Sequence, residues 1–239
     1  MLAAFGAKGS PELLPGGTGR SWRVGSLVIK PLDRGADELA WQAEVLASIE
    51  WDGFRVARPL PMVVDGWTAS DYVAGEHRPG RWREIIRVGE RFHGALAGLP
   101  RPDAVIDARA DPWAVGDRVA WGEAPFPELD DVLSALKPVH APSQLIHGDL
   151  TGNVLFHDEL PPAIIDFAPY WRPTEFASAI VVADALNWEG ASDELAQLVH
   201  PQYLLRALVY RAVTTRLTGP AGPIPELDLA RKILASASP

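Results

Sequence analysis

The chain has 239 residues and a formal net charge of -9, which argues against nucleic acid as its main partner because a phosphate backbone binds basic surfaces. Cysteine is absent from the sequence, so disulfides and thiolate zinc sites are excluded. No apolar segment has the length of a membrane-spanning helix, and the first residues lack the pattern of a signal peptide. We therefore expect a cytoplasmic protein with one large or two small domains and no membrane partner.

The first predicted unit, residues 11–30, is a small β structure with a glycine-rich turn. Three short segments separated by turn residues can form strands: 13–14, 21–24 and 27–30. The first turn contains glycines that allow backbone N–H groups to approach a phosphate closely: Gly16, Gly17 and Gly19. Lys30 ends the third apolar segment, and a lysine that leaves a strand beside such a turn can contact nucleotide phosphates. The alternative is an ordinary hairpin loop with an exposed lysine at the end of a strand.

Residues 37–50 predict a helix, because their apolar residues recur at helical spacing. Two glutamates on this helix differ in position. Glu38 falls within the apolar arc and can face Lys30, whereas Glu44 falls on the polar side. Further apolar segments at 54–59 and 62–64 predict additional short strands of the same sheet.

The sequence changes character near Ala74 and Gly75. A strand ending in Tyr72-Val73 precedes this point, and helical patterns predominate after it. The expected helices cover residues 81–98, 112–119, 128–136, 174–188, 192–199, 202–217 and 225–235. We therefore place a boundary between two lobes here, with residues 1–74 in the first lobe and residues 75–239 in the second.

Residues suited to phosphate transfer gather between positions 145 and 167. His147-Gly148-Asp149 follows an apolar pair, Asn153 comes soon after it, and Asp166 ends a second apolar segment. Two short strands can hold these polar side chains at a shared edge. Asp149 is the candidate base that orients an acceptor hydroxyl, and Asn153 and Asp166 offer hard oxygen ligands for Mg²⁺. We expect His147 to brace the loop by hydrogen bonds and Gly148 to allow a tight turn before the aspartate.

These motifs resemble those of the aminoglycoside phosphotransferase and choline kinase group, which shares the protein-kinase-like fold. The resemblance covers nearly the whole chain in order, although its specific motifs lie within residues 145–176. It implies a two-lobed α+β protein with a small N-terminal β-sheet lobe that carries one helix and a larger, mostly helical C-terminal lobe. Residues 1–74 would bind the nucleotide, and residues 75–239 would contribute catalysis and acceptor binding.

The resemblance also assigns roles to individual residues. Asp149 would be the catalytic base, and Asn153 and Asp166 would hold Mg²⁺. Lys30 would bind the nucleotide phosphates, with Glu38 pairing with it in preference to Glu44. The glycine-rich turn would cover the phosphates, and backbone groups of two hinge residues would hold adenine: Tyr72 and Val73.

One spacing departs from the family pattern. Only Leu150, Thr151 and Gly152 separate Asp149 from Asn153, which is one residue fewer than the resembled kinases have. The loop must therefore be tighter, and Gly152 is the residue that can allow this.

The activity that the resemblance implies is transfer of the γ-phosphate of ATP or GTP to a hydroxyl of a small molecule, either aminoglycoside-like or another small metabolite. The short loop favours an alternative, a kinase-like protein that binds nucleotide with little or no catalysis. A second alternative is a metal-dependent hydrolase built from His147, Asp149, His157 and Asp166. Four acidic residues beyond the motifs could line a pocket for a cationic acceptor or could be solvated helix charges: Asp184, Glu189, Asp193 and Glu194. The acceptor and the oligomeric state are left open by the sequence.

Overall fold

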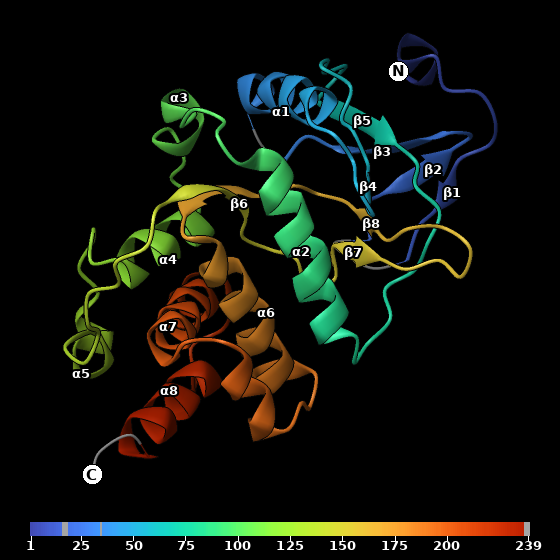
Figure 1. Cartoon of the computed structure of the whole chain (residues 1–239). Coiled ribbons are helices and arrows are strands. Elements are labelled where there is room, and N and C mark those ends of the chain that lie inside the picture. The colour runs from blue at the N-terminus through green and yellow to red at the C-terminus, as the bar shows by residue number, and fades with distance from the viewer. Residues whose placement is uncertain (16–18, 34, 237–239) are drawn as a thin grey trace. The chain divides into compact units, whose positions relative to one another are not determined.

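The computed structural model describes residues 1–15, 19–33 and 35–236 (Figure 1). These residues form two compact units. Unit 1 consists of residues 1–78 and 152–167, and unit 2 consists of residues 79–151 and 168–239. A single boundary near residue 75 does not reproduce this division, because the segment 152–167 belongs with the N-terminal residues. The functional division between residues 1–74 and 75–239 stays a prediction.

Unit 1 contains a four-stranded antiparallel sheet with the strand order β1-β2-β3-β5. Its strands are β1 (Glu12–Leu13), β2 (Trp22–Val24), β3 (Leu27–Pro31) and β5 (Trp67–Asp71) (Figure 1). Ile29 and Ala69 lie opposite each other and pack with Phe5 of a short 3-10 helix (Leu2–Phe5). Because successive side chains of a strand alternate between its faces, Lys30 and its partner Thr68 lie on the other face. The alternating direction of side chains along β3 thus keeps Lys30 out of this core.

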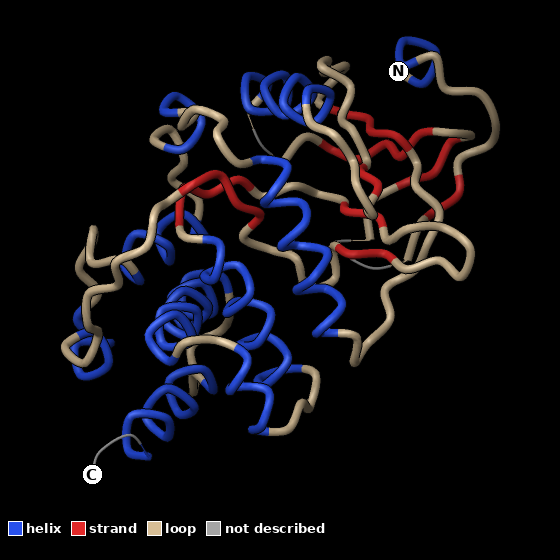
Figure 2. Tube along the Cα trace, in the orientation of Figure 1, coloured by secondary structure: helices blue, strands red, loops and turns tan. Residues whose placement is uncertain are grey.

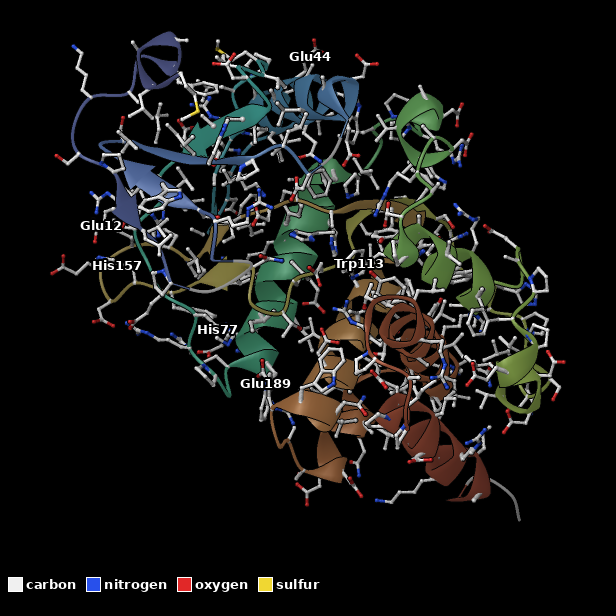
Figure 3. All side chains as sticks on the ribbon, turned by 180° about the vertical axis from the view of Figure 1, so that it is seen from behind. Glu12, Glu44, His77, Trp113, His157 and Glu189 are labelled. Carbon is white, nitrogen blue, oxygen red and sulfur yellow. The ribbon has the colours of Figure 1, made fainter. Side chains whose placement is uncertain are left out.

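Helix α1 (Ala36–Ser48) confirms the helix that the spacing predicted. Its buried side chains are Gln42 and Leu46, and Gln42 Nε2 donates to the backbone oxygen of Phe167 over 3.1 Å. The ring of Trp41 stacks with that of Phe167 at a centroid distance of 6.3 Å. Glu44 is exposed on the outer side of the helix, as predicted (Figure 3). These contacts attach α1 to the residue that follows Asp166.

A second sheet of unit 1 joins segments from distant parts of the sequence. Strand β4 (Arg55–Val56) pairs in parallel with β8 (Ala163–Ile164), which pairs in turn with β7 (Val154–Leu155). The prediction that residues 54–59 and 62–64 add strands to the first sheet is therefore wrong. Toward the first sheet, Pro59 and Val64 make isolated bridges to β5, and Pro59 and Pro61 lack the backbone N–H that a continuous ladder needs.

Unit 2 is mainly helical, with one two-stranded sheet (Figure 2). Strand β6 (Gln144–His147) pairs with β9 (Pro169–Arg172) in antiparallel fashion. The α-helices are α2 (Trp82–Leu96), α3 (Asp103–Ile106), α4 (Pro112–Ala120), α5 (Asp130–Leu133), α6 (Thr174–Trp188), α7 (Pro201–Thr218) and α8 (Pro225–Ser236). Helix α7 packs against α4, α6 and α8, and α2 packs against α6 and β6. None of the helices in the described part of the chain is both long and apolar enough to span a membrane.

The long helices of unit 2 follow the predicted spacing, whereas two of the shorter ones differ. Residues 128–136 form a 3-10 turn (Pro127–Leu129) and then α5, and residues 192–199 form a 3-10 helix (Asp193–Leu198). Short segments gain little from helical propagation, so local contacts decide between 3-10 and α geometry.

Candidate functional site

In unit 1 the structure brings Lys30 and Asp166 together. Lys30 Nζ lies 2.8 Å from Asp166 Oδ1 and 3.4 Å from Asp33 Oδ2. Asp166 has a backbone φ of 48°, a left-handed conformation that aspartate tolerates better than most residues. The amide of Ile165 donates to the backbone oxygen of Asn153 over 3.0 Å, which fixes the segment before Asp166 against the start of β7. The local backbone thus presents the Asp166 carboxylate to a cation.

Two carboxylates contact the Lys30 ammonium in the structure. The carboxylates that contact the Lys30 ammonium belong to Asp33 and Asp166, whereas Glu38 Oε1 accepts a hydrogen bond from Gln42 Nε2 over 3.0 Å. The two glutamine bonds, to Glu38 and to the Phe167 oxygen, hold α1 beside the Asp166 segment. The pairing of Glu38 with Lys30 stays a prediction.

A cavity of about 60 Å³ lies in unit 1 between the first sheet and α1. Apolar side chains of Val28, Leu39 and Leu46 form part of its wall, and Lys30 and Asp166 supply charges. The residues fit a hydrated divalent ion. Asp166 is about half exposed at 50%, and its oxygen already accepts an ammonium group at 2.8 Å in this structure. Mg²⁺ is commonly bound by one or two protein oxygens together with water and substrate phosphates, so the Asp166 carboxylate can serve as one such protein ligand.

The remaining predicted nucleotide-binding residues have the following positions. Tyr72 follows β5, its amide donates to the Ser26 oxygen over 2.8 Å, and the Arg23 guanidinium lies 3.9 Å from its ring centroid. Val73 comes next along the chain. Gly19 has a φ of 67°, which favours glycine, while Gly16 and Gly17 lie outside the described residues. The roles proposed for these residues in adenine and phosphate binding stay predictions.

In unit 2 the catalytic-loop candidate is braced by histidine, as predicted. His147 is fully buried at the end of β6, and its Nδ1 accepts hydrogen bonds from the amides of Asp149 (3.1 Å) and Ala168 (3.5 Å). The amide of His147 donates to His93 Nε2 over 3.0 Å. Both acceptor roles require neutral imidazole rings. The two histidines therefore position the backbone from which Asp149 projects.

Gly148 is required for a reason other than the predicted one. It is not among the residues with positive φ, but a Cβ atom built at this position would overlap the ring of Tyr170. Gly152 does have a φ of 78°, which confirms that it absorbs the tighter turn before Asn153. Close packing against β9 therefore requires glycine at position 148, and the backbone conformation favours glycine at position 152.

We expect acid to destabilise the protein through His93. Burial, and to a smaller extent the nearby His147, lowers the pKa of His93 to about 3. The unfolded chain takes up this proton near the ordinary value of 6.5, so the folded state binds fewer protons between these two values. The free energy of unfolding should therefore fall as the pH drops from 6.5 toward 3, by about 1.4 kcal/mol per pH unit for this group.

Urea unfolding at a series of pH values measures this effect. His93→Gln removes the titrating ring and should flatten the pH dependence, while the matched variant at an exposed histidine, His140→Gln, should leave it unchanged. Equal slopes for wild type and His93→Gln would contradict the assignment.

A buried arginine contacts the candidate base, and sequence reasoning did not identify it. Arg211 of α7 donates through Nε and Nη2 to the two oxygens of Asp184, both at 2.7 Å, and through Nη2 to Asp149 Oδ1 at 2.8 Å. The side chains of Arg211 and Asp184 are 7% and 1% exposed, and that of Asp149 is 38% exposed. Burial alone lowers the pKa of Arg211, but Asp184 and other nearby groups outweigh it and hold that pKa well above its ordinary value. A charged residue inside the apolar run of α7 was the signal available in the sequence.

The four acidic residues considered for a cationic pocket lie in different environments. Asp184 is neither solvated nor part of an open pocket, because its side chain is buried in an ion pair with Arg211. Glu189 lies at the C-terminal end of α6 (Figure 3). It accepts a hydrogen bond from the Trp82 indole. Asp193 pairs with Lys232 at the surface over 2.8 Å, which confirms the solvated interpretation for this residue. Glu194 is exposed.

The described residues contain no group of three or more histidine, aspartate or glutamate side chains placed to hold a metal ion. Of the four residues of the hydrolase alternative, His147 and Asp149 belong to unit 2, and His157 and Asp166 belong to unit 1.

Solved structures of several kinases and phosphotransferases resemble this chain over most of their length. The chain resembles the crystal structure of a choline kinase from Streptococcus pneumoniae, with 11% identity, a TM-score of 0.60, and coverage of 98% of this chain and 96% of that one. A choline/ethanolamine kinase family protein from Mesorhizobium loti gives 18% identity, a TM-score of 0.59, and coverage of 100% and 92%. A spectinomycin phosphotransferase in complex with ADP and spectinomycin gives 14% identity, a TM-score of 0.52, and coverage of 96% and 89%. These identities show the fold alone, and they confirm the expected kinase-like α+β fold.

No protein with a curated description matches the sequence. The sequence model of the phosphotransferase enzyme family, by contrast, matches residues 15–170, which is more than half of the chain. The matched segment includes Lys30, Asp149, Asn153 and Asp166. The protein therefore belongs to the phosphotransferase enzyme family.

Proposed function

We propose that this protein is a small-molecule kinase that moves the γ-phosphate of ATP or GTP to a hydroxyl group of its acceptor. The observation that carries the proposal is the pair formed by Lys30 and Asp166, because it joins a phosphate-binding cation to a metal-binding carboxylate beside a cavity. Family membership supports phosphate transfer, and a related fold binds ADP with spectinomycin. The acceptor is an aminoglycoside-like compound or another small hydroxylated metabolite, and the reaction takes place in the cytoplasm.

Each residue has a defined part in this proposal. Lys30 leaves Asp166 to bind nucleotide phosphates when the nucleotide enters. Asp166 and Asn153 hold Mg²⁺, which supplies charge neutralisation on the phosphates when it is bound. Asp149 accepts the proton of the acceptor hydroxyl, so that the oxygen can attack phosphorus. Glu38 orients Lys30, the glycines at positions 16, 17 and 19 cover the phosphates, and the hinge backbone at 72–73 holds the base.

Calorimetric titration with ATP and GTP, each with and without Mg²⁺, is the first experiment. We expect binding that requires Mg²⁺, followed by ADP or GDP release when a panel of aminoglycosides, choline-like alcohols and sugars is added. A Lys30→Met variant is the control for specific phosphate binding and should weaken the nucleotide affinity. Absence of nucleotide binding under all conditions would refute the proposal.

The short loop supports one competing function, a nucleotide-binding protein without transfer activity. Three residues separate Asp149 from Asn153, and a misplaced Asn153 would leave Asp166 as the remaining metal ligand. Nucleotide binding that does not depend on Mg²⁺, with no turnover for any acceptor, would favour this alternative.

A further inference from the structure

The ion pair between Arg211 and Asp184 reaches beyond itself to the candidate base. Asp184 accepts two charge-assisted hydrogen bonds from Arg211, in the side-by-side geometry that matches a guanidinium to a carboxylate. The bond from Nη2 to Asp149 Oδ1 is a third bond of similar length, 2.8 Å. One buried guanidinium thus connects a carboxylate that is almost fully buried with another that solvent can reach.

The position of the guanidinium is fixed from several sides. Asp184 lies on α6 and Arg211 on α7, and these two helices pack against each other. The Arg211 Cζ atom lies 5.1 Å from the ring centroid of Tyr210 and 5.6 Å from that of Trp188. Paired charges and flanking rings hold the side chain in one rotamer. The atom that contacts Asp149 therefore belongs to a rigid part of unit 2.

Burial of Arg211 does not by itself require the bond to Asp149. Asp184 alone neutralises the guanidinium and satisfies two of its donors, as a buried pair needs. The additional bond goes to a residue in a loop, and that residue's side chain is 38% exposed. Its effect falls on the loop, because it fixes the rotation of the Asp149 carboxylate about its own side-chain bonds.

We infer that Arg211 is a positioning residue for phosphate transfer: it holds the Asp149 carboxylate in the orientation from which it accepts the proton of the acceptor, and Asp184 holds Arg211. This inference rests on the proposed function. A base must lie within hydrogen-bond reach of the proton that it takes, and small displacements of reacting groups cost large factors in rate. Arg211 belongs to unit 2, whereas the nucleotide-binding candidates belong to unit 1.

The test uses variants that separate positioning from folding. Arg211→Met leaves Asp184 buried and unpaired, so it should lower the resistance to urea as well as kcat. The double variant Asp184→Leu with Arg211→Met replaces the buried pair by apolar groups and should recover much of that resistance, while kcat stays about 10- to 100-fold below wild type. Arg211→Lys keeps the charge and should recover part of kcat.

Arg206 provides the matched control. It lies on the same helix, is buried to the same extent, and donates to the backbone oxygens of Gln202 and Lys137. Arg206→Met should reduce stability and leave kcat unchanged. For all variants, the calorimetric affinity for the Mg²⁺ complex of the nucleotide should equal that of the wild type.

The outcomes are distinguishable. A folded double variant with wild-type kcat would overturn the positioning role while leaving the kinase function in place. A loss of nucleotide affinity parallel to the loss of kcat would overturn it as well, because it would indicate a general structural effect. A wild-type protein that transfers phosphate to no acceptor would fail at the earlier step and refute the proposed function itself.

Discussion

Asp149→Asn is expected to lower kcat for phosphate transfer by about 10²- to 10⁴-fold and to leave the affinity for nucleotide unchanged. The amide has nearly the same shape as the carboxylate, and its oxygen can still accept the hydrogen bond from Arg211 Nη2. The loop should also keep its conformation, because its brace is the bond from the Asp149 backbone amide to His147. What the variant loses is the ability to take a proton from the acceptor hydroxyl.

Steady-state ADP release with a hydroxyl acceptor measures kcat, and calorimetry measures nucleotide affinity. Asp130→Asn, at an exposed position at the start of α5, is the control for removal of one negative charge from unit 2. Turnover of Asp149→Asn equal to that of the control would remove Asp149 from the role of base.

Asp166→Asn is expected to weaken Mg²⁺-dependent nucleotide binding by about 100-fold or more, because a charged metal ligand is lost. Asparagine is the informative replacement, since it tolerates the left-handed backbone that Asp166 adopts with φ 48°. Asp166→Ala should show the same loss of binding together with about 1–2 kcal/mol lower stability, because alanine is strained in that conformation. Comparing the two variants separates the metal role from the backbone effect.

Titration with nucleotide and Mg²⁺ measures the first effect, and urea unfolding measures the second. Asp33→Asn is the matched control, because Asp33 also contacts Lys30 but has no proposed metal role. If Asp166→Asn bound the Mg²⁺ complex of ATP as tightly as the wild type, the metal assignment would be refuted.

The sequence by itself determined which segments form the principal elements and which polar residues are exceptional. Apolar spacing located α1, α2, α6, α7 and α8 within a few residues, because one buried face imposes a helical period. The apolar segment 27–29 located the strand that ends with Lys30, because a run of this kind bounded by turn residues favours a strand. His147 was correctly predicted to brace its loop, because a buried imidazole needs hydrogen-bond partners.

Only the tertiary structure decided which of these residues meet. Periodicity defines the face on which a side chain lies but not the partner on the other side of the contact. The pairing of β4 with β8, the bond of Lys30 to Asp166 across 136 positions and the bond of Arg211 to Asp149 across 62 positions leave no local signal. Asp184 shows the consequence most clearly: an aspartate on a helix is typical of a solvated surface, and only the packing of α6 on α7 makes it the buried partner of an arginine.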